Sequence, residues 1–235
     1  MSETTQTLLT AQTEWLTGES LLCGLLGKLL YTLPERDWYR ALVAEDVFAE
    51  LPLATDQPDV IAGWQRLQAW RVGLGAGLSD EAFEAISADY YQLFLGPGAM
   101  KAPLWESVYF NDEHLLFQEQ TSQVRHWYEA FGLQSTNTNH EPEDHLGLEL
   151  NFLAHLASRG LEALDAGEPA ALDELLTAQR QFLRSHLLVW VAPWSSLVEQ
   201  RARTPFWPAI AQLTHGALTA VAAHLETVAP AGVNG

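Results

Sequence analysis

Basic residues are scarce in this chain of 235 residues. Lys and Arg number 12 against 30 Asp and Glu, so the formal net charge at pH 7 is -18. Nucleic acids and anionic membrane surfaces are bound through Lys and Arg, and this composition therefore argues against both as partners. It favours a basic partner, attracted by a long-range field that salt weakens. From composition alone, acidity that only keeps the protein in solution is the simpler explanation.

Cysteine and long apolar runs are also scarce. The single Cys23 excludes an intramolecular disulfide and fits a reducing compartment. It lies in the apolar run 21–30, which indicates a packed small side chain and not a nucleophile. No uninterrupted apolar run reaches the roughly 20 residues that span a bilayer. The first basic residue is Lys28, whereas signal peptides begin with basic residues. We therefore expect a cytoplasmic protein without stable membrane insertion.

The alternation typical of β-strands is absent, and so are internal repeats. Apolar residues instead recur at helical spacing along most of the chain, which predicts an all-α bundle of roughly nine to ten helices. The expected helices cover residues 13–31, a short segment after Pro34, a segment capped by Asp56, a segment capped by Ser79, residues 112–131, 142–159 and 169–190, a short segment after a turn at 192–195, and a last helix that begins at Pro205 with Thr204 as its cap.

Two details of this helix pattern are specific enough to be tested by the structure. The buried stripe of the helix at 112–131 is expected to contain Phe117, Val124, Tyr128 and Phe131, with Gly132 at its C-terminal end. Residues Gln134 to His140 are uniformly polar, which predicts a hinge. We therefore expect an N-terminal helical part at 1–133 with a Gly/Pro-aromatic loop, a hinge at 134–141, and a C-terminal helical part at 142–235.

Two dense segments are candidates for a binding site. The first combines Tyr91-Gln92-Leu93-Phe94-Leu95-Gly96-Pro97-Gly98 with the aromatic sequence from Pro103 through Trp105 to Tyr109. The second is Glu141-Pro142-Glu143-Asp144-His145, which precedes an apolar helical run at 146–156. Large aromatics after a proline usually pack inward, and acidic residues in a first helical turn complement the helix dipole. The functional interpretation is an aromatic groove for an apolar peptide, beside a carboxylate that pairs with guanidinium groups. In that interpretation neighbouring carboxylates favour the protonated form of His145, but such a residue could equally just hold the loop by hydrogen bonds.

Catalytic motifs are weak. His145 and Glu149 lie four residues apart and could share a helix face, but no further metal ligand follows at a diagnostic spacing. No Gly-x-Ser-x-Gly elbow is present, and the glycines at 73–77 lack the spacing of a phosphate loop and a preceding strand. We therefore expect no enzyme, no metal and no cofactor. A small metal- or nucleotide-dependent enzyme using Asp144, His145 and Glu149 stays open as the alternative.

The same motifs resemble the TorD/DmsD family of redox-enzyme maturation chaperones. The resemblance is carried by Phe94 with the Gly96-Pro97-Gly98 loop, by Pro103-x-Trp105-Glu106-Ser107-Val108-Tyr109, by Glu141-Pro142-Glu143-Asp144-His145-x-Gly147, and by later marks at Pro193-Trp194 and Thr204-Pro205-Phe206-Trp207. It implies an all-helical cytoplasmic chaperone that binds the twin-arginine leader peptide, the apo-molybdoenzyme catalytic subunit, or both. Such chaperones delay export until the molybdenum cofactor is inserted.

The resemblance also implies a binding surface and an oligomeric behaviour. Together with the two segments above it yields a peptide-binding set of Leu93, Phe94, Trp105, Tyr109, Glu141, Asp144 and His145. Which of Glu141, Glu143 and Asp144 faces the ligand stays open. So does binding of a guanine nucleotide. Leu104 and Gly98 depart from patterns frequent in the family, which leaves the client enzyme open. A homodimer formed by domain swapping across the hinge is expected as one state of such a chain.

Overall fold

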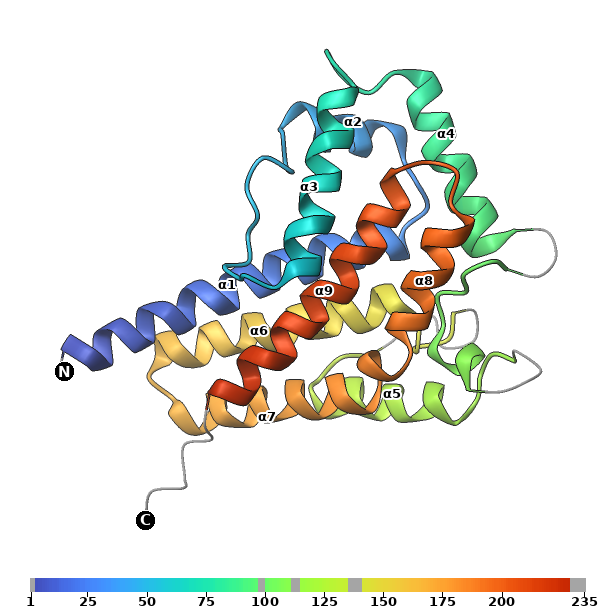
Figure 1. The fold of residues 1–235 in the computed structure, drawn as a ribbon. Coiled ribbons are helices and arrows are strands. Elements are labelled where there is room, and N and C mark those ends of the chain that lie inside the picture. The colour runs from blue at the N-terminus through green and yellow to red at the C-terminus, as the bar shows by residue number, and fades with distance from the viewer. Residues whose placement is uncertain (1–2, 97–99, 111–114, 135–140, 229–235) are drawn as a thin grey trace.

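Helices form almost all of the regular structure. The computed structural model describes residues 3–96, 100–110, 115–134 and 141–228 (Figure 1). Within these ranges the chain forms nine α-helices, three short helical turns and no strand, which confirms the all-α prediction. The α-helices are α1 (Glu3–Tyr31), α2 (Arg36–Ala44), α3 (Pro58–Gly73), α4 (Asp80–Tyr90), α5 (Glu119–Ala130), α6 (Leu146–Ala166), α7 (Pro169–Ser185), α8 (Val191–Arg201) and α9 (Phe206–Thr227). The short turns are η1 (Tyr91–Leu95), η2 (Glu106–Tyr109) and η3 (Leu187–Val189).

The ends of the helices follow local chemistry, with two caps misplaced by the sequence prediction. Ser79 caps α4 as expected, because its side chain accepts a hydrogen bond from the Ala82 amide. The cap of α3 is Gln57, one residue after the predicted Asp56. The predicted cap Thr204 is also wrong: its hydroxyl donates to Asp89 at 2.8 Å, and Pro205 occupies the cap position of α9. The error at Thr204 arises because its partner Asp89 is distant in the sequence.

Several predicted boundaries are wrong, including the start of α1, which begins at Glu3 and not near residue 13, and the end of α7, which lies at Ser185 and not near residue 190. Helix α6 begins at Leu146 and not near residue 142, and α5 begins at Glu119, with residues 111–114 outside the described part of the chain. Phe117 precedes α5, has a φ of 57° and is 50% exposed, so it does not belong to a buried stripe. Val124 and Tyr128 are buried as predicted, and Gly132 has the positive φ (79°) typical of a residue after a helix end. The turn predicted at 192–195 is instead the first turn of α8.

Long antiparallel helix contacts join the beginning of the chain to its end. Helix α1 packs along α6, and α3 packs along α9, which crosses the front of the molecule in Figure 1. Glycines permit both close approaches. A Cβ on Gly147 of α6 would lie 2.7 Å from the Tyr31 Cβ of α1, and a Cβ on Gly63 of α3 would lie 2.7 Å from the Leu213 amide of α9. The core therefore extends continuously across these helix pairs.

The predicted hinge falls on residues that mostly lie outside the described ranges. Residues 135–140 are not described, so the division into two parts stays a prediction. The α1–α6 and α3–α9 contacts each connect a helix before residue 134 with a helix after residue 141. Among the described residues, no helix is long and apolar enough to cross a membrane.

Candidate functional site

Backbone hydrogen bonds bring the two sequence segments together. The Glu106 amide donates to the Asp144 carbonyl at 2.9 Å, and the Leu146 amide donates to the Leu104 carbonyl at 2.7 Å. Trp105 and His145 form the resulting isolated antiparallel bridge. This pairing sets the aromatic segment directly against the acidic turn that leads into α6.

Two of the three acidic residues in that turn point inward. Asp144 is fully buried and accepts hydrogen bonds from the Ser107 amide (2.8 Å) and the Thr121 hydroxyl (2.6 Å). Glu143 is fully buried and forms a bidentate pair with Arg125 at 2.9 and 3.0 Å. Because both precede the first residue of α6, they do not sit in its first turn as predicted. Their role in this structure is to bind the turn to η2 and α5.

Glu141 is the member of the turn that retains exposed surface. It is half-buried, and its Oε1 accepts a hydrogen bond from the Trp105 indole Nε1–H at 2.9 Å. Burial raises the pKa of the Glu141 carboxyl, and the charge of Asp144 adds to this effect, while the Trp105 hydrogen bond lowers it. The carboxylate is thus held by an aromatic side chain and keeps part of its surface exposed.

His145 is a structural residue in this geometry. It is the N-cap of α6, and its Nδ1 accepts a hydrogen bond from the Gly147 amide at 3.0 Å. Burial lowers the pKa of the imidazole to about 3, so the ring is neutral at ordinary pH. The interpretation in which nearby carboxylates favour its protonated form is wrong, because burial lowers its pKa. The alternative interpretation, in which His145 holds the loop by hydrogen bonds, agrees with the cap that it provides.

The remaining predicted residues are mostly internal. Leu93 and Phe94 are fully buried, and the Phe94 ring packs against Tyr90, Trp194 and Trp207. Tyr109 donates from its hydroxyl to the Pro103 carbonyl at 2.8 Å. Trp105 is only 6% exposed. In this conformation Leu93 and Phe94 offer no surface to a ligand, and their binding role stays a prediction.

Tyr31 is a surface residue of the site that sequence reasoning missed. It ends α1, is 37% exposed, and packs its ring edge-on to His145 with 5.3 Å between centroids. Burial and the negative charge of Glu141 raise the pKa of its hydroxyl. No local pattern could have indicated it, because the α1–α6 contact alone brings it here. We call Tyr31, Trp105 and Glu141 together the Glu141 face.

The residues of the enzymatic alternative do not converge. Both Asp144 oxygens are occupied by Ser107 and Thr121, and His145 uses Nδ1 to cap α6. Glu149 points toward Glu106 and His186 instead. Asp144, His145 and Glu149 therefore form no common site in the described part of the chain.

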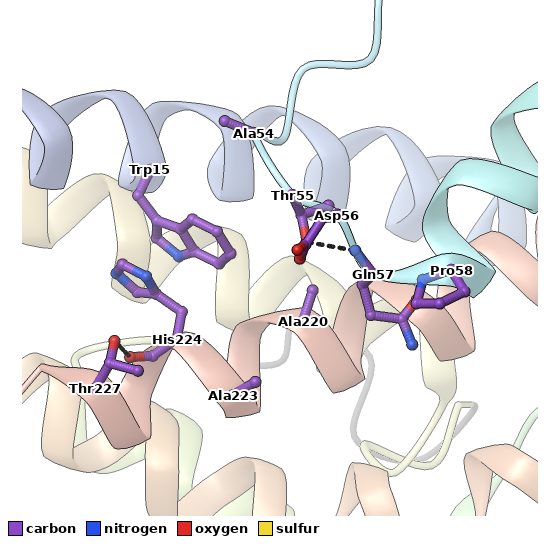
Figure 2. A pocket seen from close by; sticks show the side chains of 10 residues that line it. All are labelled: Trp15, Ala54, Thr55, Asp56, Gln57, Pro58, Ala220, Ala223, His224 and Thr227. Atoms are coloured by element: carbon purple, nitrogen blue, oxygen red, sulfur yellow. Dashed lines mark hydrogen bonds between the residues drawn. The ribbon is translucent and has the colours of Figure 1, made fainter.

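A separate hollow of about 850 Å³ lies between α1, the segment before α3, and the last turns of α9 (Figure 2). Figure 2 shows Trp15 stacked on His224 at one end of its lining, with 3.8 Å between the two ring centroids. Trp15 and Tyr31 belong to the same helix, 16 residues and roughly 24 Å apart along its axis. This hollow is therefore distinct from the Glu141 face.

Known protein sequences match most of this chain. The family described as nitrate reductase delta subunit matches residues 55–196, which is more than half of the chain. The chain belongs to this family. The matched range contains η1, η2, the acidic turn and α6, but it does not contain Tyr31, which comes from α1.

Individual relatives of this family member are chaperones by name. It is 28% identical over 192 residues to the Tat proofreading chaperone DmsD of Salmonella typhi, covering 80% of this chain and 81% of that protein. It is 34% identical over 128 residues to the chaperone protein TorD of Vibrio cholerae, covering 54% of this chain and 56% of the relative. A probable DmsD of Haemophilus influenzae is 30% identical over 129 residues, covering 55% and 56%. The resemblance to the TorD/DmsD family is thereby confirmed.

Proposed function

We propose that this protein is a cytoplasmic chaperone that binds the twin-arginine leader, the apo form, or both, of a molybdoenzyme and delays its export until the cofactor is inserted. The relatives named as Tat proofreading chaperones support this function. The chaperone acts here by binding and not by catalysis. Its net charge of -18 attracts a leader that carries two arginines.

The observation that carries the proposal in molecular terms is the orientation of Glu141. A leader guanidinium meets a carboxylate whose Oε1 is already held by Trp105, and the partly exposed Tyr31 ring lies beside it. Because Glu143 and Asp144 are saturated by internal partners, Glu141 is the residue of the turn that takes the arginine. Pairing with a cation would offset the burial that raises the Glu141 pKa.

Titration calorimetry with a synthetic leader peptide tests this assignment. The wild-type protein is expected to bind a peptide with two consecutive arginines followed by an apolar stretch, and to bind less tightly as salt rises. Glu141→Gln is expected to weaken binding about 10-fold, since it removes one charge-assisted hydrogen bond. Glu162→Gln is the matched control, because Glu162 is exposed on α6 far from the Glu141 face.

The possible results test leader binding and the role of Glu141 separately. A wild-type protein that does not bind the arginine peptide at any salt concentration contradicts leader binding and restricts the proposed function to binding of the apo form. Binding that is equal in the wild type, Glu141→Gln and Glu162→Gln contradicts only the role of Glu141. Replacing both peptide arginines by lysine should also weaken binding to the wild type, since lysine lacks the bidentate geometry.

A further inference from the structure

A buried polar cluster is formed by side chains from the segments next to the Glu141 face, and the proposed function does not use it. It consists of Glu106 at the start of η2, Glu149 in the first turn of α6, and His186 directly after α7. These side chains are at most 2% exposed, and one ligand atom from each lies within 4.8 Å of the others. His186 Nδ1 lies 2.9 Å from Glu106 Oε2.

Glu149 is the unsatisfied member of this cluster. Among the described residues, neither of its carboxylate oxygens has a hydrogen-bond partner, although the side chain is fully buried. Within the described ranges the Trp190 Nε1–H also lacks a partner at ordinary hydrogen-bond geometry, but it lies close enough to Glu149 to lower the pKa of that carboxyl. Burial raises the Glu149 pKa more strongly, and the negative charges of Glu106 and Asp144, together with the close approach of the Glu106 side chain, raise it further. Such a site requires a positive charge or a proton to compensate its carboxylates.

We propose that Glu106, Glu149 and His186 form a buried binding site for one divalent metal ion of the zinc type. Two carboxylates and a neutral imidazole compensate a doubly charged ion, so that the bound site carries no net charge. One imidazole beside two carboxylates favours zinc or a similar transition metal, because calcium takes six to eight oxygen ligands. The Trp190 N–H is placed to donate to a ligating oxygen of Glu149 and so to orient it.

The geometry requires only small movements of the side chains. Ligands about 2.0 Å from a tetrahedral zinc ion lie about 3.3 Å from each other. The contact of 2.9 Å between His186 and Glu106 must open slightly, and the wider separations, up to 4.8 Å, must close. A water fills the fourth position of such a three-ligand site. The ion would connect η2, the start of α6 and the end of α7, and so brace the turn that presents Glu141.

Metal analysis after controlled refolding tests the proposal. Untagged protein is unfolded in denaturant with a chelator, since the site is closed to solvent, and refolded with Zn²⁺, with Co²⁺ or with chelator alone. The wild type is expected to retain one metal ion per chain and to show the visible absorption of tetrahedral Co²⁺. At about 100-fold excess of free metal over its Kd, Tm should rise by about 5–10 °C. Binding should weaken as pH falls, because the ligands must lose their protons.

Two variants and one control locate the site. Glu149→Gln and His186→Gln should fold without metal, lose the bound ion and show no metal-dependent shift in Tm. Glu19→Gln removes an equally buried carboxyl outside the cluster and should retain the ion. A wild type refolded without metal uptake, or an ion kept by both cluster variants, would overturn the proposal. If the variants do not fold, the number of metal ions per wild-type chain and the Co²⁺ spectrum of the wild type test the proposal instead. A spectrum typical of octahedral Co²⁺ bound at the surface would contradict the buried site.

Discussion

Trp105 combines a packing role with an orienting one. Its ring is almost fully buried, stands edge-on to His145 at 5.2 Å between centroids, and donates its N–H to Glu141. The sequence predicts that Trp105 lines a groove, and only its indole N–H, which reaches Glu141, has a place in such a groove in this structure. A substitution of Trp105 therefore changes both the core and the proposed binding surface.

Two substitutions separate those roles. Trp105→Ala should lower the free energy of unfolding by about 3–5 kcal/mol, because it leaves a cavity in the core. Trp105→Phe keeps a packed ring and removes only the hydrogen bond to Glu141, so it should cost about 1 kcal/mol and still weaken leader binding. Urea unfolding and calorimetry measure the two effects. An alanine variant as stable as the wild type would show that the indole is not a core residue.

Glu19 makes stability depend on pH. Its side chain is fully buried on α1. The Gln179 side-chain amide donates a hydrogen bond to Glu19 Oε1 at 3.1 Å while its oxygen accepts one from the Ala157 amide. Oε2 of Glu19 has no partner in the described part of the chain. Burial raises its pKa to about 8, against 4.5 for an ordinary Glu. The folded state therefore holds the proton more tightly than the unfolded state. Stability contributed by this proton is complete below pH 4.5 and is lost as pH rises to about 8.

Replacing Glu19 by glutamine tests this dependence. Glu19→Gln should be more stable than the wild type at pH 8 by a few kcal/mol, since an amide carries no charge to desolvate. Its melting temperature should fall less between pH 5 and pH 8. Glu14→Gln, which removes an exposed carboxyl of the same helix, is the control and should follow the wild type. Parallel pH profiles for all three proteins would contradict a buried, protonated Glu19.

At the scale of elements, the contact between α1 and α6 positions the Glu141 face. Gly147 and Gly27 let the two helices approach, since a Cβ on Gly147 would lie 2.7 Å from the Tyr31 Cβ and 2.8 Å from the Gly27 carbonyl oxygen. The same contact holds Tyr31 against His145. A methyl group at this point must therefore separate the helices.

Alanine substitutions on both helices measure this effect. Gly147→Ala should destabilise the fold by about 1–3 kcal/mol through overpacking. Gly24→Ala, on α1 where the new Cβ would meet only the Ala154 Cβ at 3.9 Å, should stabilise it by about 0.5–1 kcal/mol. The denaturant concentration at the midpoint of unfolding measures the stability of each variant. Equal midpoints for the two variants would contradict the close helix contact inferred here.

At the scale of the whole molecule, the contacts of α1 with α6 and of α3 with α9 are the ones that two chains would exchange in a domain-swapped dimer. Such a dimer stays a prediction. Deleting Thr136 to Asn139 shortens the segment between Gln134 and Glu141, which should disfavour closure within one chain and raise the dimer fraction. Light scattering coupled to size-exclusion chromatography measures this fraction. A folded deletion variant that remains monomeric at high concentration would contradict domain swapping.

Much of the secondary structure was predictable because it rests on local chemistry. Ser79 caps a helix, Gly132 follows one, and the burial of Cys23 follows from its apolar run. The family was also predictable, because its motifs lie in short continuous segments. The start of α6 was misplaced because Pro142 suits a first helical turn, whereas Arg125 and Thr121 hold Glu143 and Asp144 in an extended turn before it.

The sequence by itself therefore determined the helical class, the approximate positions of most helices and the acidic and aromatic segments of the site. The tertiary structure alone decided which of those side chains reach solvent. Burial and pairing depend on neighbours distant in the chain, so Glu143, Asp144 and His145 turned inward while Glu141 stayed accessible. For the same reason Tyr31 joined the Glu141 face, and Glu106, Glu149 and His186 converged on one point from three separate segments.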